Sequence, residues 1–140
     1  MSARILVIDD EPQIRKFLRI SLTANGYAVS EAANAAEGIA LARAELPDLL
    51  ILDLGLPDMD GQEVISAVRE FSAAPILVLS VRADEFDKVE ALDRGAGDYV
   101  VKPFGIAELM ARVRACLRAQ APKAADEVIA IGGLAIDLAR

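Results

Sequence analysis

The sequence of 140 residues has little cysteine, few aromatic residues and no long apolar run. Its single cysteine, Cys116, excludes an internal disulfide bond. Because Cys116 lies at helical spacing from Leu109 and Val113, we expect it to be a buried apolar side chain. Aromatic residues make up 4% of the chain and hydrophobic residues 54%, so we expect a core of Ala, Val, Ile and Leu.

Long apolar segments are missing as well. No stretch approaches the roughly 20 apolar residues of a membrane span. The apolar run at the N-terminus is short and is interrupted by Asp9 and Asp10, which is not typical of a signal peptide. We therefore expect a soluble, cytoplasmic protein with no membrane partner.

Positive charge is scarce too. The chain has 15 Lys and Arg against 22 Asp and Glu, for a net charge of -7. Phosphate backbones bind surfaces rich in Lys and Arg. This balance disfavours nucleic acid as a direct partner of the chain.

What the sequence does contain is a regular alternation of strand-like and helical patterns. The apolar runs cover residues 5–8, 28–30, 49–52, 76–79 and 99–101, and the helical patterns cover residues 12–25, 35–45, 61–71, 85–94 and 106–118. Such alternation is typical of an α/β domain with a parallel sheet. All runs except the second are nearly continuous in apolar residues, as strands buried on both faces are. We expect the second run to form an edge strand.

The composition changes after Arg118. We expect residues 1–120 to form one domain, followed by a linker rich in Ala, Pro and charged residues at 121–127. Residues 128–140 contain two apolar runs around a Gly-Gly pair, which is typical of a hairpin. We expect this last segment to begin a second domain that is truncated in the sequence.

Polar side chains suited to phosphoryl chemistry follow four of the five apolar runs. They are Asp9 and Asp10, Asp53, Ser80 and Lys102. Ligands bind at the carboxyl ends of the strands in an open parallel sheet, so we expect these groups to converge on one site. Singly, the acids before Pro12 and the serine are also typical of helix caps, and the lysine of a solvated strand end. The combination favours a functional site.

The three carboxylates would repel one another unless a cation lay between them. Mg²⁺ prefers carboxylate and carbonyl oxygens together with water, so the sequence predicts a magnesium site at Asp9, Asp10 and Asp53. Asp53 follows the run expected to be central in the sheet, which favours it as a nucleophile that forms an aspartyl-phosphate. Lys102 can pair with this carboxylate or with the phosphoryl group, and Ser80 can donate a hydrogen bond to a phosphoryl oxygen.

Four motifs carry a resemblance to a known family. They are residues 7–11 (VIDDE), 52–61 (LDLGLPDMDG), 79–80 (LS) and 102–104 (KPF). Together they resemble those of bacterial response-regulator receiver domains, over about residues 3–120. Residues 95–99 (GAGDY) and the tail after residue 120 resemble the branch in which the receiver precedes a winged-helix DNA-binding domain. Residues 54–57 (LGLP), 80–82 (SVR), 92–93 (LD) and 102–105 (KPFG) resemble the regulators of Kdp-type potassium uptake.

The resemblance implies a flavodoxin-like (CheY-like), doubly wound five-stranded parallel sheet of strand order 2-1-3-4-5. It implies that Asp53 accepts a phosphoryl group from a sensor histidine kinase. Mg²⁺ would be bound directly by Asp10 and Asp53, largely through water by Asp9, and by the carbonyl oxygen of Gly55. Lys102, followed by a cis peptide bond, would bind the phosphoryl group.

The resemblance also implies a switch and an output. Ser80 and Tyr99 would form a switch pair, in which the hydroxyl moves toward the phosphate and the aromatic ring rotates inward. Activation would produce a homodimer through a face that carries Lys88, Asp98, Glu108 and Arg112. Gly97 departs from the branch, where an acid is usual, so one charge pair expected at this face is missing.

Two further positions are expected to set the lifetime of the phosphoryl group. In receivers, the residues at the positions of Gly55 and Arg82 flank the line along which water attacks. Gly55 has no side chain to orient a water molecule, and Arg82 can cover the phosphoryl group and bond its oxygens. The alternative for Arg82 is that it extends into solvent. The first possibility predicts slow self-dephosphorylation.

We therefore expect the receiver domain of a two-component transcriptional regulator of potassium-uptake genes. It would not be an enzyme, although it assists its own phosphorylation and dephosphorylation, and it would reach DNA only through a C-terminal domain absent from this sequence. One alternative is a stand-alone phosphorelay receiver without DNA output. The other is a phosphatase of the haloacid-dehalogenase type, whose Asp-x-Asp pattern after the first strand fits poorly with the Asp-Asp-Glu-Pro found here.

Overall fold

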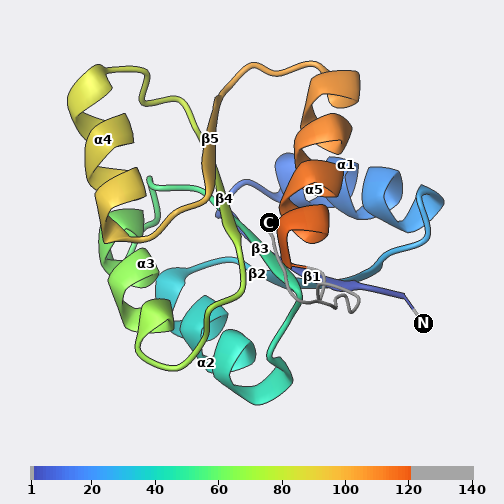
Figure 1. Ribbon diagram of the computed structural model, residues 1–140, viewed down its shortest axis with the longest axis horizontal. Coiled ribbons are helices and arrows are strands. Elements are labelled where there is room, and N and C mark those ends of the chain that lie inside the picture. The colour runs from blue at the N-terminus through green and yellow to red at the C-terminus, as the bar shows by residue number, and fades with distance from the viewer. Residues whose placement is uncertain (1, 121–140) are drawn as a thin grey trace, which may run out of the picture.

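The computed structural model describes residues 2–120, which form a sheet with helices on both faces (Figure 1). The strands are β1 (Arg4–Ile8), β2 (Ala28–Ala32), β3 (Leu49–Leu52), β4 (Ile76–Ser80) and β5 (Asp98–Val101). They pair in parallel in the order β2-β1-β3-β4-β5. This confirms both the expected strand order and the expected edge position of β2. The predicted linker and the predicted start of a second domain lie outside the described residues.

All five predicted helices are present and begin where predicted. They are α1 (Pro12–Ala24), α2 (Ala35–Glu45), α3 (Gly61–Arg69), α4 (Glu85–Arg94) and α5 (Ile106–Gln120). The predicted end of α3 at residue 71 is wrong. The N–H groups of Glu70 and Phe71 donate to carbonyls three residues back, so the helix tightens and closes after Arg69. Every one of these helices is too short or too polar to cross a lipid bilayer.

Local signals explain where the helices begin and end. Pro12 lies at the start of α1, where its missing N–H is not needed. Asn34, Asp60 and Asp84 precede α2, α3 and α4, and each accepts a hydrogen bond from a backbone N–H of the first turn. Gly95 ends α4 with φ at 119°, a conformation that favours glycine.

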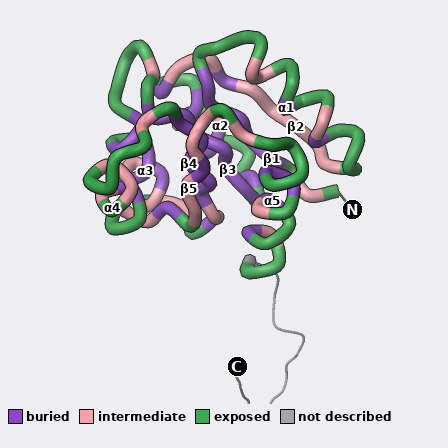
Figure 2. The backbone as a smooth tube through the Cα atoms, turned by 90° about the horizontal axis from the view of Figure 1, so that it is seen from above, coloured by how far each residue is buried: buried purple, intermediate pink, exposed green. Residues whose placement is uncertain are grey.

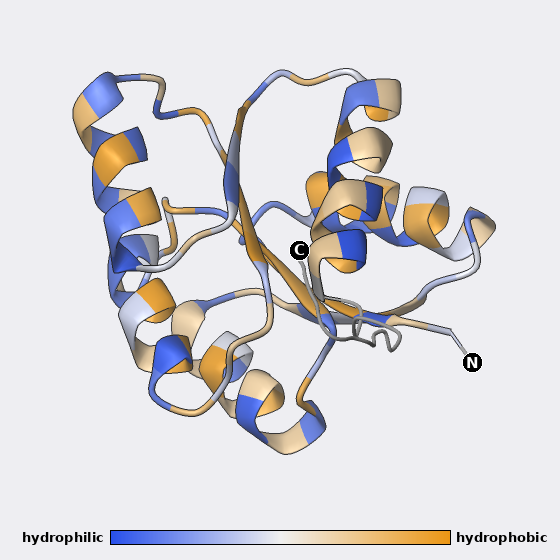
Figure 3. Ribbon diagram, viewed as in Figure 1, coloured by the Kyte–Doolittle hydropathy of each residue, from blue (hydrophilic) through white to orange (hydrophobic). Residues whose placement is uncertain are grey.

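The sheet separates two apolar cores. Alternate residues of β1 point to opposite faces, so Ile5 and Val7 pack with α1 and α5, whereas Leu6 and Ile8 pack with α2 and α3. α4 joins the second core through Ala91. Buried residues are concentrated in the strands, and exposed residues in the helices and loops (Figure 2). The hydropathy colouring follows the same division, with apolar strands and mixed helices (Figure 3).

Parallel pairing brings the carboxyl ends of the strands to one edge of the sheet. β1 pairs with β3 residue by residue, so Asp9 and Asp53 emerge side by side, and the Asp53 N–H donates to the Ile8 carbonyl over 2.9 Å. The Lys102 N–H donates to the Ser80 carbonyl over 2.8 Å. The chain leaves β1 toward one face and β3 toward the other, which opens a crevice between these two strand ends.

Candidate functional site

The three predicted carboxylates lie together at this edge of the sheet. One carboxylate oxygen from each of Asp9, Asp10 and Asp53 lies within 4.8 Å of the others. Asp9 and Asp53 are buried, and Asp10 is exposed. Burial raises the pKa of Asp9 more than its hydrogen bonds from the Glu11 N–H and from Lys102 lower it.

Lys102 is bonded to several of these acids at once. Its Nζ donates to Asp9 Oδ2 and Glu11 Oε1 over 3.0 Å, and to Asp53 Oδ2 over 3.4 Å. Only 9% of its side chain is exposed. Burial lowers the pKa of Lys102, but the hydrogen bonds to Asp9 and Glu11 and the surrounding negative charge outweigh it, so the pKa lies above its ordinary value. The following peptide bond to Pro103 is cis, as the family resemblance implies.

Glu11 is a residue of the site that was not predicted from the sequence. Its carboxylate nevertheless pairs with Lys102 and lines the same hollow as Asp53. A signal was present, because Glu11 directly follows the two acids at the end of β1. The side chains of consecutive residues diverge on a regular strand, however, so only the turn into α1 brings this third acid to Lys102.

The donor set fits a magnesium ion. Four carboxylates gather here, from Asp9, Asp10, Glu11 and Asp53, against the single ammonium group of Lys102. The net charge is therefore strongly negative, and oxygen is the ligand atom that Mg²⁺ prefers. Asp9, Asp10 and Asp53 are the residues that would hold it.

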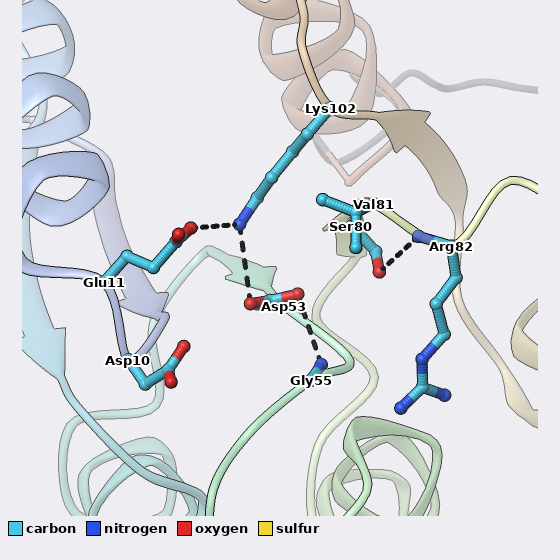
Figure 4. A pocket seen from close by; sticks show the side chains of 8 residues that line it. All are labelled: Asp10, Glu11, Asp53, Gly55, Ser80, Val81, Arg82 and Lys102. Atoms are coloured by element: carbon cyan, nitrogen blue, oxygen red, sulfur yellow. Dashed lines mark hydrogen bonds and ion pairs between the residues drawn. The ribbon is translucent and has the colours of Figure 1, made fainter.

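A hollow of about 260 Å³ opens above Asp53 (Figure 4). It is lined by Asp10, Glu11, Asp53, Gly55, Ser80, Val81, Arg82 and Lys102. A water molecule takes about 30 Å³ in the liquid, so the hollow can hold a phosphoryl group together with water. The Gly55 N–H donates to Asp53 Oδ1 over 3.2 Å, and the space where a Cβ of Gly55 would lie is open.

Ser80 and Tyr99 are both bonded to the main chain of Arg82. The Arg82 N–H donates to the buried Ser80 Oγ over 3.2 Å, and the Tyr99 hydroxyl donates to the Arg82 carbonyl over 2.8 Å. Burial is the main cause that raises the pKa of Tyr99. The two predicted switch residues are therefore linked through one peptide segment between β4 and α4.

Residues 5–114 match the family of the response regulator receiver domain. This chain belongs to that family. Receiver domains are regulatory modules rather than classical enzymes, so the family assignment replaces the phosphatase alternative. The matched residues make up most of the chain and include all five strands of the sheet, apart from Arg4 at the start of β1.

The receiver is similar to curated transcriptional regulators. The transcriptional regulatory protein KdpE of Mycobacterium tuberculosis (strain ATCC 25618 / H37Rv) is 50% identical over 137 residues, which cover 96% of this chain and 61% of that protein. The KDP operon transcriptional regulatory protein KdpE of Escherichia coli (strain K12) is 48% identical over 136 residues, which cover 96% of this chain and 60% of that protein. The chain thus spans about three fifths of these relatives.

The fold is also that of a solved receiver. The crystal structure of the CheY-like response regulator receiver domain protein from Methanospirillum hungatei JF-1 superposes with a TM-score of 0.82 at 30% sequence identity. The match covers 86% of this chain and 97% of that one.

Arg82 of this receiver lines the hollow, but its guanidinium is bonded to groups outside the set of lining residues. Its Nη1 lies 3.1 Å from Asp60 Oδ2 and 3.9 Å from Asp87 Oδ1, and its Nη2 donates to the Leu54 carbonyl over 3.4 Å. From the sequence, Arg82 was expected either to contact a phosphoryl group or to extend into solvent. Neither expectation includes its two acidic partners, because Asp60 and Asp87 are predictable as helix-start residues but not as neighbours of Arg82.

Three of the four residues predicted for a dimer face lie together. Arg112 pairs with Asp98 over 2.8 Å and with Glu108 over 3.3 Å, all within one chain. Lys88, on α4, forms no ion pair with any residue from 2 to 120. Gly97, which has no acidic side chain to add to this face, donates its backbone N–H to the Ile76 carbonyl over 2.8 Å.

Proposed function

We propose that this receiver accepts a phosphoryl group on Asp53 from a sensor histidine kinase. The observation that carries the proposal is the position of the Asp53 carboxylate, which lies at the floor of the hollow between Lys102 and Ser80 (Figure 4). One carboxylate oxygen faces Lys102 Nζ and the other faces the Gly55 N–H. A nucleophile, a cation and a hydroxyl therefore surround one space.

In the proposed transfer, a carboxylate oxygen of Asp53 attacks the phosphorus of a phosphohistidine on the kinase. The new bond is O–P, the P–N bond breaks, and its electron pair stays on the histidine nitrogen. Lys102 balances the negative charge of the phosphoryl oxygens, and the Ser80 hydroxyl donates a hydrogen bond to one of them. When bound at Asp9, Asp10 and Asp53, Mg²⁺ supplies further charge neutralisation.

The output of the reaction would be a change in the population of two conformers. Phosphorylation adds roughly 1.5 to 2 negative charges, and a difference of a few kcal/mol moves such an equilibrium. We propose that the favoured conformer forms a homodimer through Lys88, Asp98, Glu108 and Arg112. Dimerisation would pair DNA-binding domains outside this chain. The similarity to two KdpE proteins supports potassium-uptake genes as the target.

The nucleophile is tested with acetyl phosphate and Mg²⁺, followed by mass spectrometry of the intact protein and its peptides. We expect a single labelled residue, Asp53, and no label in Asp53→Asn. Asp93→Asn is the matched control, because Asp93 is an exposed acid on α4 with no ion pair to any residue from 2 to 120. A label that persists in folded Asp53→Asn would contradict the assignment.

A further inference from the structure

Among residues 2–120, Arg82 is the one cation in contact with a group of acids at the starts of α3 and α4. Asp60 and Asp87 are its ion-pair partners, and Asp84 lies beside Asp87, whose backbone N–H donates to Asp84 Oδ1 over 2.8 Å. Burial and the neighbouring Asp84 and Asp60 raise the pKa of Asp87, whereas Arg82 lowers it. The first turn of α4 therefore has a local excess of negative charge that Arg82 partly balances.

The same residue is connected to the phosphoryl-acceptor site in two ways. Arg82 lines the hollow with Asp53, where Lys102 is the only other cation among the lining residues, although its guanidinium is turned toward Asp60 (Figure 4). Its main chain holds Ser80 Oγ and the Tyr99 hydroxyl. One residue thus contacts the acceptor pocket, both predicted switch residues and the start of α4.

A phosphoryl group on Asp53 would compete for this guanidinium. Arginine binds phosphate oxygens through two parallel N–H bonds, and a dianion attracts it more strongly than one carboxylate does. The present partners hold it weakly, because the Arg82 side chain is 30% exposed and Asp60 is 45% exposed. An exchange of partners therefore costs little.

We propose that Arg82 exchanges partners when Asp53 is phosphorylated, and that this exchange releases the first turn of α4. The guanidinium would leave Asp60 and Asp87 and bind the phosphoryl oxygens. Asp87 would then face Asp84 and Asp60 without a cation, and their repulsion would loosen the turn. This inference rests on the proposed role of Asp53 as phosphoacceptor.

The exchange predicts an energetic coupling between Arg82 and Asp87. The probe is beryllofluoride with Mg²⁺, titrated calorimetrically into the unmodified chain, Arg82→Gln, Asp87→Asn and the double variant. Arg82→Gln should weaken binding about three- to tenfold, because a charged contact to the bound group is lost. Asp87→Asn should tighten binding a few-fold, because Arg82 is then easier to release. In the double variant, Asp87→Asn should add no further gain.

Matched controls separate this coupling from a general effect of charge. Asp93→Asn makes the same charge change on α4, and Arg114→Gln removes an exposed arginine on α5. Both should leave the affinity unchanged. Hydrogen exchange provides a second measurement: beryllofluoride should increase exchange at residues 85–88 in the unmodified chain, and this response should be lost in Arg82→Gln.

The outcomes distinguish the inference from the function on which it rests. If beryllofluoride does not bind and acetyl phosphate does not label Asp53, the proposed function fails. If both react with Asp53 but Asp87→Asn has the same effect with and without Arg82→Gln, the inference alone is overturned. Should Arg82→Gln fail to fold, equal affinities of Asp87→Asn and Asp93→Asn would overturn it.

Discussion

At the scale of single residues, this receiver brings four carboxylates around one lysine. Asp9 and Asp53 are buried, yet each of their carboxylates forms an ion pair only with Lys102 among residues 2–120. Such a group of like charges costs stability in the absence of a further cation. The site is arranged to bind charge, at the expense of the stability of the metal-free fold.

The first prediction concerns Asp10 and Mg²⁺. Millimolar Mg²⁺ should raise the melting temperature of the unmodified chain by several degrees, because a ligand that binds only the folded state stabilises it by mass action. Asp10→Asn should raise the melting temperature of the metal-free protein by about 1–3 °C, because repulsion is relieved, and it should abolish the response to Mg²⁺. Thermal unfolding followed by circular dichroism measures both.

Asp93→Asn is the control, since it removes an exposed acid that is not part of the cluster and should leave the Mg²⁺ response intact. The proposed metal site would be contradicted if millimolar Mg²⁺ left the melting temperature of the unmodified chain unchanged.

The second prediction concerns Gly55 and the lifetime of the aspartyl-phosphate. No heavy atom lies within 4 Å of the Cβ position of Gly55, so the Cβ of Gly55→Asn would meet no clash. Its amide could orient a water molecule for attack on phosphorus, so hydrolysis should quicken several-fold. The decay of phosphorylated protein after removal of acetyl phosphate measures this rate.

Gly105→Asn is the matched control, because the Cβ position of Gly105 is equally open but does not line the hollow. Adding Arg82→Glu to Gly55→Asn should quicken the decay further, because the guanidinium no longer covers the phosphoryl group. The folding of this double variant must be measured as well, because the new acid would face Asp60 and Asp87 and be repelled by them. Unchanged decay in both variants would rule out control of water access by these positions.

At the scale of secondary-structure elements, the loop between β3 and α3 is fastened to α2. Asp58 accepts hydrogen bonds from the Ala35 N–H over 2.8 Å and from the Ala36 N–H over 2.9 Å, both at the start of α2. These two bonds, the one to Ala35 first, hold the pKa of Asp58 below its ordinary value. The loop that contains Gly55 thus has a fixed position relative to a neighbouring helix.

The third prediction follows from this lowered pKa. The carboxylate of Asp58 stabilises the folded state above pH 3.8, its ordinary pKa, and this contribution is lost as the pH falls through the lower pKa of the folded state. Asp58→Asn should therefore lower the melting temperature at pH 7, and the difference from the unmodified chain should vanish in acid. Melting curves of both proteins between about pH 2 and pH 7 measure this difference, because that range includes the ordinary pKa of an aspartate.

Asp93→Asn again provides the comparison, because it removes an exposed acid that accepts no helix-capping hydrogen bond. A constant difference between Asp58→Asn and the unmodified chain at every pH would show that the charge of Asp58 does not contribute to stability.

At the scale of the whole molecule, the proposed output is a surface formed by α4, β5 and α5. Arg112, on α5, pairs within one chain with Asp98 of β5 and Glu108 of α5. Besides Lys88, α4 carries the exposed apolar side chains of Val89 and Leu92. A two-fold symmetric contact would place these ion pairs opposite their copies on a second receiver.

The fourth prediction is that Arg112→Glu weakens the activated dimer. The new acid would face Asp98 and Glu108 of its own chain and of the second chain, so the contact becomes repulsive. We expect at least a tenfold weaker dimer in beryllofluoride by analytical ultracentrifugation, with labelling of Asp53 by acetyl phosphate unchanged. Arg118→Glu is the control, as an exposed arginine without an ion pair to residues 2–120. An unaltered dimer would show that another surface is used.

The sequence by itself determined the identity of the elements and the chemistry at the strand ends. Continuous apolar runs predicted β1, β3 and β4, and all five helices begin where capping residues and periodicity placed them. These signals are local, because they depend on hydrophobic spacing and on backbone hydrogen bonds within a few residues. Asp9, Asp10 and Asp53 could be assigned to one site because parallel strands end at one edge.

Only the tertiary structure decided which charged groups are partners. The pairing of Glu11 with Lys102 and of Arg82 with Asp60 and Asp87 joins residues from different elements. Long side chains reach in many directions from one backbone position, so their contacts depend on the packing of the surrounding helices rather than on spacing in the sequence. The link from the acceptor site to α4 is of this kind, and no pattern along the chain encodes it.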